Sequence, residues 1–424
     1  MNNSQTSEQV HQRSPMPSFE KKIIASILNR IREDRRTPST IAPSESDQRA
    51  EAIPAAKVRE AKISDYHAVT ELKRRWSLIP DGFENWEKLW VRNPALAQAE
   101  AERPMGWILE AGGSVVGYLG NISSTYFYGE KILTAATAHG LVVDPLYRSA
   151  SLSLSASFFR QKSVDILLGT TAVEAVGKIA RAFRSDPLPQ PDYDTVLFWI
   201  LRPFSFAQAV SKKLKLRPSA SRGGSLLGSM VIAADKVLRR RWPKSASPQL
   251  SVKVIKVNEI GEDFERLWDA KRAERPRLLS DRRPATLRWH FEIPGDRATK
   301  RLFCCFRNHE LEGYLVLRHE PDPGDAPRRS LICDMLIKGD RTETIEALFV
   351  AAYDDAKRAG SHIIELMGFP ASIRQTFLSR NPYQRKYPAC PFYFKAIDPA
   401  LHKELSNEVN WYASPYDGDA TLMP

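Results

Sequence analysis

One run of residues combines an apolar stretch with a histidine, a proline-containing turn, an arginine and several serines. It is His139-Gly-Leu-Val-Val-Asp-Pro-Leu-Tyr-Arg148-Ser-Ala-Ser-Leu-Ser-Leu154. The pattern predicts a strand over 133–143 that passes through the turn into a helix over 151–162. The first backbone amides of such a helix lack intrahelical acceptors and lie at the positive end of its dipole. The run therefore predicts an anion site, and a pyrophosphate group suits it.

The elements around this run are those of a mixed α/β domain. Strands are expected over 58–61, 105–111, 114–125, 133–143, 165–168 and 195–201. Helices are expected over 65–75, 84–93, 151–162 and 173–183. The order is β-α-α-β-β-β-α-β-α-β, which places the run after the fourth strand.

Four residues of the run resemble the acyl-CoA motif of the GNAT acyltransferase superfamily, Val-x-Pro-x-Tyr-Arg-x-x-Gly-x-Gly/Ala. They are Val143, Pro145, Tyr147 and Arg148. A strand, turn and helix with a capping or ion-paired arginine would explain Arg148, but not the proline and tyrosine beside it. The resemblance covers about residues 57–202 and implies a GNAT-like fold with acetyl-CoA or another acyl-CoA as co-substrate.

The resemblance also implies which residues contact that co-substrate. Arg148 would open the pyrophosphate loop, and the strand before it would pair with the pantetheine arm. The implied contacts are Leu141, Val142, Val143, Arg148, Ser149, Ala150, Ser151, Leu152 and Ser153. The chain departs from the motif at its two glycine positions, which are Ser151 and Ser153, and a Cβ there makes close approach of a phosphate harder.

Acyl transfer needs a base for the attacking group, and the sequence offers candidates. His139 lies four residues before Val143 on one predicted strand, so the two are expected to share a face, and a neutral imidazole could take the proton. Glu174 follows the strand over 165–168 and is a second candidate. Tyr193 could protonate the departing thiolate. The alternatives are a structural histidine, an ordinary first-turn acid and a packed tyrosine.

The chain from 250 to 424 repeats the element order without the phosphate loop. Its strands are expected over 251–257, 301–306, 313–319, 331–337, 362–367 and 392–397, and its helices over 263–275, 285–291 and 342–359. By analogy with tandem GNAT-like transferases, it would form the acceptor side. Asp417 and Asp419 could fold back toward a cleft, but a frayed terminus is the expectation.

The remaining segments are a tail and a connector. Residues 1–55 are expected to be mostly disordered around an amphipathic helix over 19–36. Residues 203–249 form a helical connector, with helices over 204–216 and 226–242, and eleven basic residues against one acidic residue lie between 200 and 245. An anionic membrane surface is one partner of such a segment, and a solvated face is the alternative. Few aromatic residues interleave the bases, so nucleic acid fits less well.

Composition bounds the class of protein. A net charge of +12, 42% hydrophobic and 26% charged residues describe a folded, soluble chain of 424 residues. No segment has a signal-peptide or membrane-spanning pattern, which indicates a bacterial cytoplasmic protein, peripheral at most at the inner membrane. The cysteines show no zinc spacing, so no metal is expected. They are expected to be reduced, and they are Cys304, Cys305, Cys333 and Cys390.

Three functions follow. The first is an acyl-CoA-dependent N- or O-acyltransferase that acts on a small metabolite, an amino sugar or a polysaccharide precursor by direct attack. The second keeps the fold and takes aminoacyl-tRNA as donor, as in FemAB-like transferases. The third is a non-catalytic binding protein whose serine-substituted loop marks a lost site.

Overall fold

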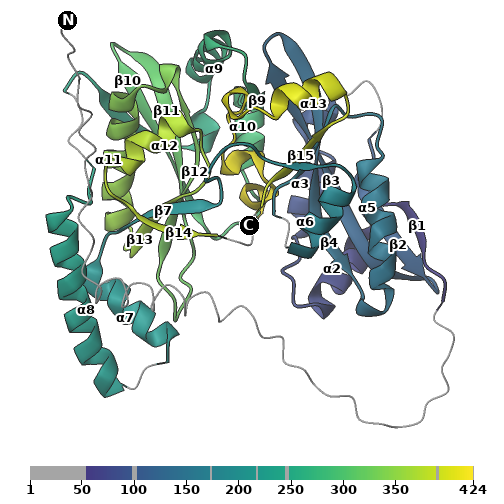
Figure 1. Ribbon diagram of the computed structural model, residues 1–424, viewed down its shortest axis with the longest axis horizontal. Coiled ribbons are helices and arrows are strands. Elements are labelled where there is room, and N and C mark those ends of the chain that lie inside the picture. The colour runs from purple at the N-terminus through teal and green to yellow at the C-terminus, as the bar shows by residue number, and fades with distance from the viewer. Residues whose placement is uncertain are drawn as a thin grey trace, which may run out of the picture. The chain divides into compact units, whose positions relative to one another are not determined.

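The computed structural model describes residues 54–97, 103–171, 174–215, 218–243, 248–387 and 391–423. The predicted helix over 19–36 and Cys390 lie outside these ranges. The described chain is built on two mixed sheets (Figure 1). The predicted mixed α/β class is confirmed.

The first sheet has the strand order β1-β2-β3-β4-β5-β15-β6, and β9 pairs with the far end of β3. Its strands are β1 (Lys57–Glu60), β2 (Gly106–Ala111), β3 (Ser114–Tyr128), β4 (Lys131–Val143), β5 (Ile166–Gly169), β6 (Asp186–Pro187), β9 (Leu278–Ser280) and β15 (Tyr393–Ala396). Strand β4 pairs antiparallel with β3 and parallel with β5.

Helices cover both faces of this sheet. They are α2 (Tyr66–Arg75), α3 (Phe83–Trp90), α4 (Pro94–Ala97), α5 (Ser151–Phe159) and α6 (Glu174–Ala182). Leu72 of α2 shares a buried cluster with Ile108 of β2, whereas Phe158 of α5 shares another with Leu109. Because Ile108 and Leu109 are neighbours on a strand, α2 and α5 lie on opposite faces.

The second sheet has the order β14-β7-β13-β12-β11-β10-β8. Its strands are β7 (Thr195–Ile200), β8 (Ser251–Ile255), β10 (Thr299–Arg307), β11 (Glu310–His319), β12 (Arg329–Ile337), β13 (Ile363–Leu366) and β14 (Tyr383–Lys386). The helices that pack on this sheet are α9 (Glu262–Glu274), α10 (Pro284–Phe291), α11 (Thr342–Arg358) and α12 (Ala371–Leu378). Helix α13 (Pro399–Leu405) packs instead beside β15 of the first sheet. Cys304, Cys305 and Cys333 are buried free thiols.

The two sheets exchange strands, which differs from the expected division of the chain at residue 202. Strand β7 was expected to close the first sheet, but it pairs with β13 and β14 of the second. Strand β15 was expected in the second sheet, but it pairs with β5 and β6 of the first. Figure 1 shows the teal β7 among green strands, and β15 among blue ones. Strand β7 is buried throughout and β15 nearly so, and a short apolar run alone does not say which sheet receives the strand.

Helices α7 (Pro203–Lys213) and α8 (Pro218–Leu238) lie close to the helices predicted for the connector. They do not link the two sheets, because the strands before and after them, β7 and β8, both belong to the second sheet. None of the helices in the described ranges is long and apolar enough to cross a membrane.

The last residues of the chain are buried rather than frayed, contrary to expectation. Trp411, Tyr412 and Tyr416 are each at most 3% exposed. Short 3₁₀ turns over Pro415–Asp417 and Asp419–Leu422 bring Asp417 and Asp419 into the interior. Several aromatic side chains in a short polar segment supply the apolar area that holds it there.

Candidate functional site

A β-bulge interrupts β4 one residue after His139. His139 pairs with Gly120 and Val142 pairs with Tyr118, so Gly140 and Leu141 together face a single residue of β3. Gly140 has a φ of +62°, which is the left-handed conformation that glycine adopts readily. A Cβ at this position would come within 3.2 Å of the ammonium of Lys73. The glycine therefore makes both the bulge and the approach of a lysine possible.

The bulge moves His139 to the face opposite that of Val143, so the expectation that they share a face was wrong. Val142 packs in the cluster of α2 and α3, whereas Val143 packs beside α5. One extra residue between His139 and Val143 shifts the alternation of side chains by one. His139 therefore points to the α2 side of the sheet.

Strands β4 and β5 are paired over a short distance only. Their register joins Ala135, Ala136 and Thr137 to β5, and β4 then runs on to Val143. Residues 138–143 pair with β3 on one side and have no partner in β5 on the other. The two strands thus diverge at the bulge, and within the described residues no strand pairs with this edge of β4 beyond Thr137.

The loop after β4 leads into α5 as predicted, and it begins with a turn capped by Asp144. The Arg148 side chain is exposed and makes no ion pair or hydrogen bond with the described residues. Helix α5 begins at Ser151, and no side chain caps its first turn. The Ser151 amide donates to the backbone carbonyl of Arg148, because the 3₁₀ turn over Pro145–Ala150 continues into α5. The guanidinium of Arg148 is therefore the group that is open to an anion.

His139 is bound by a carboxylate from the C-terminal segment. Its Nδ1 lies 3.0 Å from Oδ2 of Asp419, and both residues are buried. The other oxygen of Asp419 accepts hydrogen bonds of 3.0 Å from the hydroxyls of Thr170 and Thr171. These threonines follow β5 directly, so Asp419 bridges β4 and β5 at the point where the strands diverge.

A second carboxylate lies on the other side of the imidazole. Nε2 of His139 is 3.7 Å from Oδ2 of Asp81, which accepts a 2.7 Å hydrogen bond from the ammonium of Lys73. Burial alone would lower the pKa of His139, but the hydrogen bond to Asp419 and the negative charge of Asp81 outweigh it and raise the pKa to about 8. The imidazole in turn holds the pKa of both carboxyls below their usual value against the effect of burial.

Glu174 and Tyr193 do not lie at this site. The Glu174 side chain is 85% exposed and forms a 3.2 Å ion pair with Lys178 on the surface of α6. The Tyr193 ring is buried, and its hydroxyl donates to the backbone carbonyl of Ser414. Of the three predicted catalytic residues, only His139 lies where β4 and β5 diverge.

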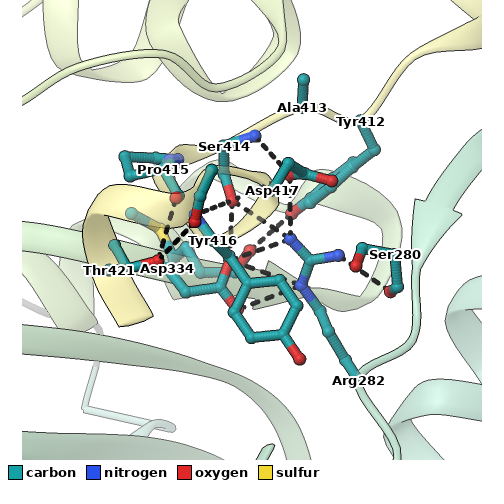
Figure 2. A network of polar contacts seen from close by, with 12 residues as sticks. Ser280, Arg282, Asp334, Tyr412, Ala413, Ser414, Pro415, Tyr416, Asp417 and Thr421 are labelled. Atoms are coloured by element: carbon teal, nitrogen blue, oxygen red, sulfur yellow. Dashed lines mark hydrogen bonds and ion pairs between the residues drawn. The ribbon is translucent and has the colours of Figure 1, made fainter. Parts of the chain in front are cut away.

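Asp419 is held in place by a buried polar network that joins the C-terminal segment to the second sheet (Figure 2). Nε of Arg282 donates to Asp334 of β12 over 3.0 Å, and the Ser414 hydroxyl donates to the same carboxylate over 2.9 Å. Asp417 accepts hydrogen bonds from Ser414 and from the Tyr126 hydroxyl of the first sheet. The network fixes the segment between the sheets and so positions Asp419.

Two hollows adjoin Trp289 of α10. A cavity of about 40 Å³ is lined by polar groups that include Thr137, Asp417 and Asp419, which leaves room for a small polar group. An open groove of about 580 Å³ runs beside it and carries Lys88 and Arg92. Trp289 lines both, so the groove and the cavity that contains Asp419 adjoin the same side chain.

Known structures resemble this arrangement, although the sequence does not match known families. No protein-family model and no curated protein matches the chain. A GCN5-related N-acetyltransferase from Anabaena variabilis ATCC 29413 superposes with a TM-score of 0.50 at 10% identity, over 81% of this chain and 73% of that chain. A probable N-acyltransferase from Enterococcus faecalis V583 gives 0.50 at 9% identity, over the same shares of the two chains.

The chain has the GNAT fold. Its two sheets correspond to two tandem GNAT-like units that exchange strands, and the predicted fold is confirmed. At this identity the likeness extends to the fold alone.

Sequence reasoning missed three groups near His139: Lys73, Asp81 and Thr170. It named Asp419 as able to fold back toward a cleft, but favoured a frayed terminus. Asp419 is 280 residues from His139 in the chain, and no local spacing connects them. The one available signal was the aromatic run before Asp419, which is unusual for an exposed terminus.

Proposed function

We propose that the protein is an acyltransferase that takes its acyl group from acetyl-CoA or another acyl-CoA. The observation that carries the proposal is the divergence of β4 and β5, which leaves the edge of residues 138–143 without a strand partner among the described residues, beside the turn that carries Arg148. Such a strand edge can pair with the amides of a pantetheine arm, and the exposed guanidinium of Arg148 can bind a pyrophosphate.

The fit of the loop is tested by its two serines. Ser151, the first residue of α5, is half-buried, whereas Ser153 is exposed, so a phosphate can reach the Ser153 side chain from the surface. The contacts proposed for the co-substrate remain the backbone of Leu141, Val142 and Val143. The loop and helix start add Arg148, Ser149, Ala150, Ser151, Leu152 and Ser153.

His139 is the proposed base. When bound, acyl-CoA would supply the thioester carbonyl that an amine or hydroxyl attacks. The neutral imidazole of His139 accepts the proton of that group, and Asp419 fixes the ring through Nδ1 and stabilises the imidazolium that forms. Because its pKa is raised to about 8, the fraction of neutral His139 increases as the pH rises through this value.

The acceptor is proposed to reach His139 through the groove beside Trp289. The groove is lined by Lys88 and by the cations Arg92 and Arg288, whereas the adjoining cavity is lined by Asp417 and Asp419. An acceptor with a polar nucleophile at one end fits the small cavity, which is compatible with a small metabolite, an amino sugar or a polysaccharide precursor. Glu174 and Tyr193 have no role in this scheme.

Release of the CoA thiol tests the proposal. The full chain is incubated with short and long acyl-CoAs and a panel of amines, amino sugars and alcohols. We expect thiol release that depends on an acceptor and falls about 10²- to 10⁴-fold in His139→Gln, while CoA binding persists. CoA binding without release for any acceptor would favour a non-catalytic binding protein. Binding of aminoacyl-tRNA in place of CoA would favour the FemAB-like alternative.

A membrane surface is the further partner proposed for residues 200–245. It is supported by observations on α8 that are independent of acyl transfer.

A further inference from the structure

Helix α8 turns its polar residues inward and its apolar residues outward. Among described residues 224–238, the exposed positions are Gly224, Leu226, Leu227, Met230, Val231, Ala233, Ala234, Val237 and Leu238. We call this set the outer stripe, and no member of it carries a polar side chain. The largest exposed fractions belong to Leu227, at 69%, and Leu238, at 82%. A helix on the surface of a globular protein normally shows the opposite arrangement.

The inner face of α8 explains why the helix is held in this orientation. Lys236 donates to the hydroxyl of Tyr353 over 2.6 Å, and Asp235 accepts from the hydroxyl of Tyr383 over 2.5 Å. Ser225 is buried 3.2 Å from Ser211 of α7. These bonds attach the polar side of α8 to the protein, so the outer stripe cannot turn inward without breaking them.

Basic residues border the outer stripe at both ends. Arg239 and Arg240 are exposed directly after it, and Trp242 follows with 40% of its surface exposed. At the other end the chain arrives from α7, where Lys212 and Lys215 are exposed. An apolar strip bordered by cations and a tryptophan has the composition of a helix that lies in the interface of an anionic bilayer.

We propose that α8 docks flat on an anionic membrane surface with the outer stripe in contact with the acyl chains. The charge pattern favours a bilayer over a second copy of this chain. Because both ends of the stripe are basic, two copies would bring like charges together whether the helices met parallel or antiparallel. Phospholipid headgroups would instead offer opposite charge at both ends. The proposal is independent of the acyl-transfer reaction.

Vesicle sedimentation with the full chain tests the proposal. We expect the protein to sediment with vesicles of phosphatidylcholine and phosphatidylglycerol, and much less with phosphatidylcholine alone. The double variant Leu227→Gln/Leu238→Gln should lower the partition coefficient at least about tenfold, since each change removes a buried side chain of the docked state. It should unfold at the wild-type temperature, because both side chains are exposed in the free protein.

A matched control uses apolar residues of similar exposure elsewhere. Ile79 is 83% exposed and Ile132 is 67% exposed, and the variant Ile79→Gln/Ile132→Gln should partition like the wild type. Equal loss in both double variants would overturn the proposal, as would a wild type that binds neither vesicle. If the wild type is a dimer that the Leu227→Gln/Leu238→Gln change dissociates, a second copy of the chain covers the outer stripe. If vesicle binding appears only after residues 1–52 are deleted, that segment covers the stripe.

Discussion

The buried contact between His139 and Asp419 makes stability depend on pH in a defined window. The pKa of His139 is raised from 6.5 to about 8 in the folded protein, so the folded state binds this proton more tightly than the unfolded state. The stabilisation is fully present below pH 6.5 and is lost as the pH rises through 8. The difference between these two pKa values corresponds to about 2 kcal/mol in the free energy of unfolding. His139 is 4% exposed, so solvent screening reduces this value little.

The assay compares unfolding free energies of wild type and His139→Gln in urea between pH 6 and pH 9. We expect the difference between the two proteins to fall by about 2 kcal/mol across this range, since the variant lacks the titrating group. The carboxyls of Asp81 and Asp419 have lowered pKa values and stay ionised throughout. A constant difference for His139→Gln, or one that grows with pH, would refute the argument.

Three further changes test other parts of the structure by urea unfolding. Asp334→Asn should cost about 3–5 kcal/mol, because it leaves the fully buried Arg282 without its main counter-charge; a cost below about 1 kcal/mol would contradict the network. Lys88→Met should stabilise the protein about 2–3 kcal/mol more at pH 6 than at pH 9. Burial lowers the pKa of this lysine to about 7, so the folded state binds the proton more weakly than the unfolded state, and the resulting cost in stability is larger at low pH. Equal effects at the two pH values would contradict this argument. Gly140→Ala should cost about 1–3 kcal/mol through its left-handed φ, and a neutral effect would contradict the bulge geometry.

Local patterns predicted the first half of the site well. The strand, turn and helix around Arg148 lie close to their expected bounds, because proline, an apolar run and a helix start act over a few residues. The bulge at Gly140 was not predictable, since a glycine within an apolar strand is equally compatible with regular pairing. That one residue decides on which face His139 lies.

The pairing of strands that lie far apart in the chain could not be predicted from the sequence. The edges of β7 and β15 carry no signal that distinguishes one sheet from the other, so their exchange appears only in three dimensions. The outer stripe of α8 illustrates the same limit in another way. Its apolar spacing was predicted, but spacing does not say whether a stripe faces a core or the outside.

Binding of CoA at the divergence of β4 and β5 is tested most directly by thermal unfolding with acetyl-CoA and longer acyl-CoAs. A ligand at one hundred times its dissociation constant stabilises the folded state by about 2.7 kcal/mol. Arg148→Ala should lose most of this stabilisation, whereas Arg160→Ala, which removes an exposed arginine at the other end of α5, should keep it. The absence of a shift with every CoA, or an unchanged shift in Arg148→Ala, would contradict the proposed site.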